Sequence, residues 1–148
     1  MGVRGVLTCP HGDGHCRSAP TSYRWRMPIT PAFVRYVDTW LRQDPAALPE
    51  ALAPDVHYVE SHGPAYRGLA QVQQWFADWH THGRVLAWDV GDHLSDGAVH
   101  ACRWRFTCVY DGNESTFDGV TWFVLDDAGR IAELHEFAAT QPVHYPYT

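Results

Sequence analysis

The sequence contains no lysine, so all eleven of its basic residues are arginine, against 17 acidic residues. The formal net charge is -6 at pH 7, which disfavours binding to the phosphate backbone of a nucleic acid. The sequence also lacks any run of the roughly 18–20 apolar residues that a membrane-spanning helix needs. Its first 26 residues contain no continuous apolar stretch of the kind found in signal peptides. We therefore expect a cytoplasmic protein without nucleic-acid or membrane partners.

Motifs that would indicate a cofactor or a covalent catalyst are missing as well. There is no glycine-rich phosphate loop, and no serine or cysteine lies in a nucleophile motif, so we expect no cofactor. Cysteine is scarce, with four residues in the chain. Cys102 and Cys108 fall in one predicted strand about 20 Å apart, too far for a disulfide bond. Reduced thiols are the simplest expectation.

Aromatic residues are abundant, by contrast, with seven Trp, seven Tyr and six Phe in 148 residues. A hydrophobic fraction of 45% and a charged fraction of 19% are typical of a globular protein, and the length fits one domain. So many large side chains suggest a bulky core wrapped around a cavity.

The composition divides the chain at Met27. Residues 1–26 are rich in Gly, Pro, Ser and Arg without hydrophobic periodicity, so we expect a disordered N-terminal extension, and one folded domain over 27–148. The segment "CPHGDGHC" offers four potential zinc ligands, but at a spacing that matches no established zinc motif: Cys9, His11, His15 and Cys16. We expect no metal site in the chain.

Three helices are predicted in the first half of the domain. Thr30 is a good N-cap and Pro31 suits the first helical position, and a second, short helix ends at Pro54. Residues 55–61 form a short strand, and a third helix covers 68–83. The first helix carries an apolar stripe at helical spacing: Phe33, Val37, Trp40 and Leu41.

The second half alternates between apolar and polar residues, which is typical of strands. Strands are predicted over 84–94, 98–110, 115–126 and 131–137, joined by turn signals such as Asp111-Gly112. Three helices with one strand among them, followed by a four-strand antiparallel meander, indicate an α+β fold in which a curved sheet packs on helices.

The order of these segments resembles the SnoaL-like branch of the nuclear transport factor 2-like superfamily. The resemblance rests on "LAPDVHYVES", "GPAYRGLAQVQQWF" and "GVTWFVLDDAGRIAELHEF" and covers about 30–145. It implies a cone-shaped α+β barrel, in which a curved, mostly antiparallel sheet wraps around three N-terminal helices and leaves an apolar pocket at the open end. Members of the superfamily include ketosteroid isomerases, polyketide cyclases, dehydratases, epoxide hydrolases and non-catalytic binders, so the fold locates the site without choosing the reaction.

The resemblance also implies candidate catalytic residues. Compared with a ketosteroid isomerase, Tyr36 occupies the position of the tyrosine on the first helix. Glu60 occupies the position of the carboxylate base at the end of the first strand. Thr121 stands where the isomerase carries an aspartic acid. A threonine can donate one hydrogen bond but cannot act as an acid, so ketosteroid isomerase activity itself is not expected.

Strand alternation extends the list of pocket candidates, provided that each chosen face is the concave one. His135 joins Tyr36, Glu60 and Thr121 as a candidate catalytic residue, and six others are candidates for binding the substrate: Phe33, Tyr58, His62, Trp104, Phe106 and Phe123. Each also fits a purely structural role. Glu60 could point to solvent, Tyr36 could be a core tyrosine, and His135 could lie on the outer face or at a subunit interface.

We therefore expect a small-molecule-binding protein, most simply a cofactor-free acid–base enzyme of the isomerase, cyclase, dehydratase or hydrolase type with a small apolar substrate. The alternatives are a non-catalytic ligand-binding or accessory protein and a structural dimerisation module. The outer face of the sheet, with Arg103 and Arg105, is the expected contact of a homodimer.

Overall fold

The first helix forms where its capping residues predict it. The structure is a computed structural model that describes residues 28–147, so the predictions for 1–26, including the four potential zinc ligands, lie outside the described residues. Helix α1 spans Pro31–Arg42, and the Thr30 side chain accepts a hydrogen bond from the Phe33 amide. A 3₁₀ turn, η1 (Pro45–Ala47), a short α2 (Leu48–Ala51) and α3 (Leu69–His82) complete the helices. Within the described residues, no helix is long and apolar enough to cross a membrane.

Six strands form one sheet in the order β2-β1-β6-β5-β4-β3. They are β1 (Leu52–Val59), β2 (Ala65–Arg67), β3 (Gly83–Asp96), β4 (Val99–Tyr110), β5 (Asn113–Leu125) and β6 (Ile131–Ala138). The predicted antiparallel meander is confirmed as β3 to β6. The prediction omitted β2, and it began the first strand after Pro54, whereas β1 begins two residues before that proline.

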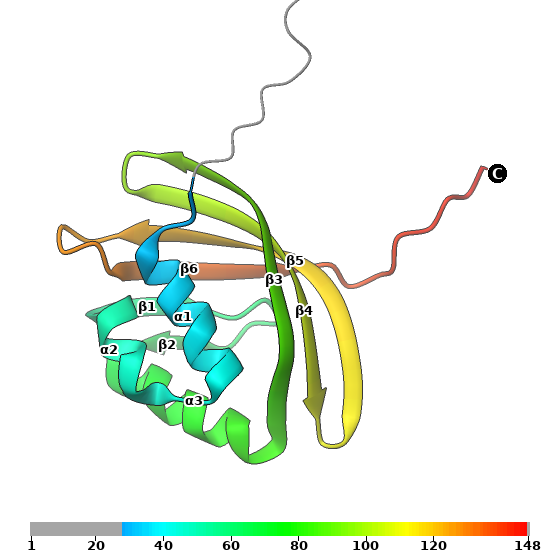
Figure 1. Ribbon diagram of the computed structural model, residues 1–148, viewed down its shortest axis with the longest axis horizontal. Helices are drawn as coiled ribbons and strands as arrows, with labels where there is room; N and C mark the ends of the chain where they lie inside the picture. Colours follow the sequence, from blue (N-terminus) through cyan, green and yellow to red (C-terminus); the bar gives the residue numbers. More distant parts are fainter. Residues whose placement is uncertain (1–27, 148) are drawn as a thin grey trace, which may run out of the picture.

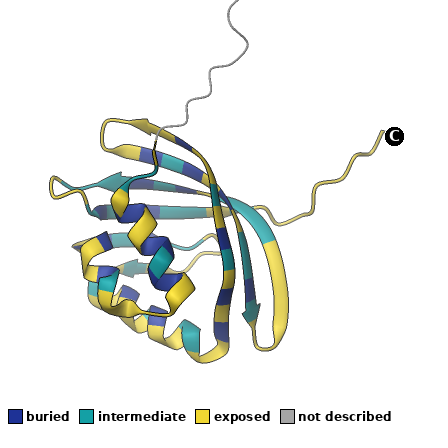
Figure 2. Ribbon diagram, in the orientation of Figure 1, coloured by how far each residue is buried: buried dark blue, intermediate teal, exposed yellow. Residues whose placement is uncertain are grey.

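The sheet is curved and does not close, and all the helices lie on its concave side (Figure 1). β1 pairs antiparallel with β2 and parallel with β6, so the parallel pair places the end of the first strand beside the end of the last. The buried residues follow the inner faces of α1 and of the long strands (Figure 2). This α+β cone confirms the predicted fold class, and it brings β1, β6, α1 and α3 around one interior space.

Candidate active site

A cavity of about 740 Å³ opens between the concave face of the sheet and helices α1 and α3. This volume lies within the range usual for small-molecule sites. Aromatic side chains make up most of its wall: Tyr36, Trp40, Tyr58, Tyr66, Trp75, Trp79, Trp88, Trp104, Phe106, Tyr110 and Phe117. Among the residues that the structure describes, the acidic groups in its lining are Glu60, Asp78 and Glu136, and no arginine lines it.

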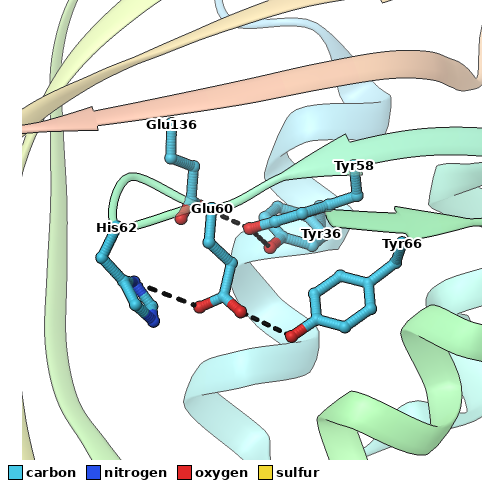
Figure 3. A network of polar contacts seen from close by, with 6 residues as sticks. All are labelled: Tyr36, Tyr58, Glu60, His62, Tyr66 and Glu136. Atoms are coloured by element: carbon cyan, nitrogen blue, oxygen red, sulfur yellow. Dashed lines mark hydrogen bonds and ion pairs between the residues drawn. The ribbon is translucent and has the colours of Figure 1, made fainter. Parts of the chain in front are cut away.

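A chain of hydrogen bonds ends on Glu136 inside this cavity. The Tyr58 hydroxyl donates to Glu136 Oε1 at 2.6 Å, and the hydroxyls of Tyr58 and Tyr36 are 2.7 Å apart. Both tyrosines are fully buried, with no exposed surface. Figure 3 shows the two rings side by side, one from α1 and one from β1, with the carboxylate reaching down to them from β6. Three separate elements, α1, β1 and β6, therefore contribute one group each to this chain of hydrogen bonds.

Burial raises the pKa of the Glu136 carboxyl to about 7 from an ordinary value of 4.5. The nearby Glu60 charge also raises this pKa, whereas the hydrogen bond from Tyr58 lowers it. Glu136 is therefore populated both with and without its proton near neutral pH, as efficient general acid–base catalysis requires. Burial, followed by the charge of Glu136, holds the pKa values of Tyr36 and Tyr58 well above their usual range, so both remain neutral hydroxyl donors.

Glu60 forms a second polar cluster at the end of β1. The Tyr66 hydroxyl donates to Glu60 Oε1 at 2.5 Å, and His62 Nδ1 lies 3.7 Å from Glu60 Oε2. The turn after the strand fixes this position, because the Glu60 amide donates to the Pro64 carbonyl and the Gly63 amide donates to the Glu60 carbonyl. The Glu60 side chain is only 11% exposed, against 69% for His62, so the carboxylate faces the cavity rather than bulk solvent.

Comparison with known families identifies the architecture of the domain. The model of the SnoaL-like domain family matches residues 33–134, which is more than half of the chain. The chain belongs to the SnoaL-like family. No curated protein sequence matches this SnoaL-like protein.

Several solved structures share the fold. A protein with a ketosteroid isomerase-like fold from Catenulispora acidiphila, solved with trimethylamine, is 17% identical with a TM-score of 0.67 over 76% of this chain and 88% of its own. An LEH-like epoxide hydrolase of M. tuberculosis is 17% identical, with a TM-score of 0.65 over 73% and 80%. A protein described as a SnoaL-like polyketide cyclase from Mesorhizobium loti is 21% identical, with a TM-score of 0.59 over 72% and 94%. At such identities, these likenesses show the fold alone.

Six of the ten candidate residues line the cavity of this SnoaL-like protein: Tyr36, Tyr58, Glu60, His62, Trp104 and Phe106. Three others lie in the core instead. Phe33 stacks on Phe123 with ring centroids 5.0 Å apart, and neither is exposed. Thr121 is also fully buried, and its hydroxyl oxygen accepts a hydrogen bond from Trp104 Nε1 at 2.8 Å. Thr121 thus holds a cavity-lining indole in place and does not itself reach the cavity.

His135 points away from the cavity, so the expected concave face of β6 was wrong. Its ring packs edge-on against Trp122 and bonds to Glu133 on the outer side of the sheet. The reason is an irregularity in the β5–β6 register, where Leu125 pairs with Ile131 but Val124 pairs with Glu133. One extra residue in β6 reverses which side chains face inward. Leu134 is fully buried and Glu136 lines the cavity as a result.

Sequence reasoning missed Glu136 and Tyr66. The sequence pattern allowed either face of β6 to be the inner one, and the pair Leu134 and Glu136 is less apolar than an expected core face. Tyr66 lies in β2, a three-residue strand too short to give an alternation signal. Its packing on Trp75, with ring centroids 4.9 Å apart, depends on the return of the chain from β1 to α3.

Glu136 should make the stability of this SnoaL-like protein depend on pH. Because its folded pKa is raised from 4.5 to about 7, the folded state holds the proton more tightly, and stability falls as pH rises through that window. We expect a loss of about 2 kcal/mol, less than the full shift would give, because the open cavity partly solvates the carboxylate.

Urea unfolding of the wild type and of Glu136→Gln between pH 4.5 and pH 7.5 measures this contribution. The variant should show a flatter dependence, and Glu114→Gln, at an exposed carboxylate on β5, should behave as the wild type does. Parallel pH curves for the wild type and Glu136→Gln would show that Glu136 titrates as it does in the unfolded chain.

Proposed function

We propose that this SnoaL-like protein is a cofactor-free acid–base enzyme acting on a small, largely apolar molecule. The observation that carries the proposal is the placement of Glu136, a desolvated carboxyl group inside an aromatic cavity and bonded to Tyr58. A perturbed carboxyl group in a concave, apolar site is the usual mark of a proton-transfer centre. The aromatic wall suits a substrate that is flat or apolar.

In this mechanism the ionised Glu136 removes a proton from a carbon next to a substrate carbonyl group and later returns it. When Glu136 takes up the proton it no longer needs the hydrogen bond from Tyr58, so the Tyr58 hydroxyl becomes free to donate to the enolate oxygen that forms. Tyr36 keeps the Tyr58 hydroxyl in position through the hydrogen bond between their hydroxyl groups. Donors that act where charge develops supply a large part of catalysis.

Isomerisation, cyclisation and dehydration share this proton-transfer step, and activation of water by the same carboxylate would give hydrolysis. Glu60, held by Tyr66 at the other side of the cavity, is the second acid–base group of the proposal. Because His62 beside it is exposed, we expect Glu60 to lie near the opening of the cavity. There it would exchange a proton with the outer part of the substrate.

The second candidate function is non-catalytic binding of an apolar amine. The observation that favours it is the charge of the lining: among the described residues that line the cavity, three acids stand among aromatic rings and none is an arginine. Aromatic faces and carboxylates together attract organic cations. The trimethylamine in the structure of the Catenulispora acidiphila protein supports this ligand class by analogy.

Three assays together separate the two functions. Exchange of the α-protons of β-tetralone in D₂O, followed by proton NMR, should exceed the buffer rate in the presence of the enzyme. Hydrolysis of styrene oxide in ¹⁸O-water tests the hydrolase version. If neither reaction is accelerated, calorimetry decides the second function. Binding of choline, without binding of its neutral isostere 3,3-dimethylbutan-1-ol, would then show that the protein is an amine binder and not an enzyme.

We further propose a homodimer through the outer face of the sheet. Val120 and Phe137 pair across β5 and β6, and both are exposed, Phe137 by 59%. Arg105 and Asp118 form a two-bond ion pair beside them. A charge introduced into an apolar contact is disfavoured by desolvation, so Phe137→Glu should sediment as a monomer. Leu41→Glu, an exposed site on α1, is the matched control, and a monomeric wild type would overturn the proposal.

A further inference from the structure

Three potential metal ligands meet on the outer face of the sheet, away from the cavity. They are His57 on β1 and Glu133 and His135 on β6. The parallel register pairs His57 with Glu133, and His135 lies two residues further along β6. Because side chains alternate along a strand, all three project from the face opposite to the cavity-lining Tyr58 and Glu136.

The side chains are close enough to share one ion. One ligand atom from each lies within 4.8 Å of the other two, and His135 Nε2 is 3.0 Å from Glu133 Oε1. The rings of His57 and His135 are nearly perpendicular, with centroids 5.8 Å apart. All three residues are partly buried. Two ligands bound at about 2.1 Å in a tetrahedral zinc site are roughly 3.4 Å apart, so the observed separations are near those that a bound ion requires.

We propose that His57, Glu133 and His135 bind a divalent transition-metal ion, with zinc as the best fit. Two imidazole nitrogens and one carboxylate oxygen form a ligand set that zinc uses in proteins, leaving one position for water. The edge-on contact of Trp122 with His135 restricts the rotation of one of the ligand rings. This site would revise the expectation of a metal-free protein.

A salt bridge between His135 and Glu133 is the simpler explanation for part of this cluster. It does not account for His57, whose ring makes no hydrogen bond within residues 28–147 although it lies beside the other two. A bound ion would use all three groups. It would also tie β1 to β6, the two strands that carry Tyr58, Glu60 and Glu136, and so would act as a structural clamp behind the cavity.

The test is calorimetric titration of the full chain with Zn²⁺ alone, together with the thermal unfolding midpoint. The wild type should bind zinc and unfold at a higher temperature with it. His57→Ala and His135→Ala should each weaken this binding by about tenfold or more, and so should Glu133→Gln. His62→Ala, at the cavity, should bind as the wild type does.

Further variants keep the test decisive. Cys9→Ala/His11→Ala/His15→Ala/Cys16→Ala measures any zinc bound by the N-terminal segment, so that its contribution can be subtracted. His57→Gln replaces His57→Ala if the latter fails to fold. Undiminished zinc affinity in both His57 variants would overturn the proposal, leaving a salt bridge between His135 and Glu133.

Discussion

Replacing Glu136 with glutamine should lower the rate of substrate proton exchange by about 10²- to 10⁴-fold, the usual contribution of a positioned acid–base group. Glutamine has the shape of glutamate, and its carbonyl oxygen can still accept the hydrogen bond from Tyr58. It cannot take up a proton near neutral pH, however. We therefore expect the loss in kcat, with little change in KM, when β-tetralone exchange is measured at pH 7.

Two further variants show whether this loss reflects the chemistry. Glu114→Gln removes an exposed carboxylate from β5, outside the cavity lining, and should retain the wild-type exchange rate. Tyr58→Phe removes the hydrogen bond that lowers the pKa of Glu136, so the midpoint of the pH–rate profile should move to higher pH. An exchange rate in Glu136→Gln within a few-fold of the wild type would rule out Glu136 as the base and direct attention to Glu60.

Gly119→Ala should destabilise the protein by about 2–3 kcal/mol through overpacking. Gly119 lies on β5 directly opposite Trp104 on β4, and the indole ring covers it. A Cβ atom there would overlap with that ring and lie 2.5 Å from the Phe137 carbonyl oxygen. The backbone cannot yield easily in a paired strand, so the indole would have to move. Its hydrogen bond to Thr121 would be strained or lost, and the cavity wall would change shape.

Urea unfolding at fixed pH measures the loss of stability. The affinity for β-tetralone or choline shows whether a displaced Trp104 indole changes the cavity. Gly91→Ala on β3 is the matched control, because a Cβ atom there meets nothing closer than the Arg103 carbonyl oxygen at 3.5 Å. The two substitutions add the same methyl group to the same sheet. Equal effects of the two would mean that Trp104 adapts freely and that Gly119 has no special packing role.

The sequence by itself determined the helices, the strand meander and the family. Thr30 and Pro31 fix the start of α1 through local capping, and alternation over β4 identified the inward row that includes Trp104 and Phe106. These signals are local, because they depend on a few neighbouring residues and on the period of one element. Tyr36, Glu60 and Tyr58 followed from the resemblance and from the same alternation.

Only the tertiary structure decided which carboxylate is the centre of the candidate site. The extra residue near the start of β6 changes the inner face from His135 to Glu136, and it is visible only in the pairing of β6 with β5. The raised pKa of Glu136 likewise depends on burial and on groups far away in the chain, since Tyr58 is 78 residues distant. Register and desolvation are properties of contacts between elements, and a pattern read along a single strand does not contain them.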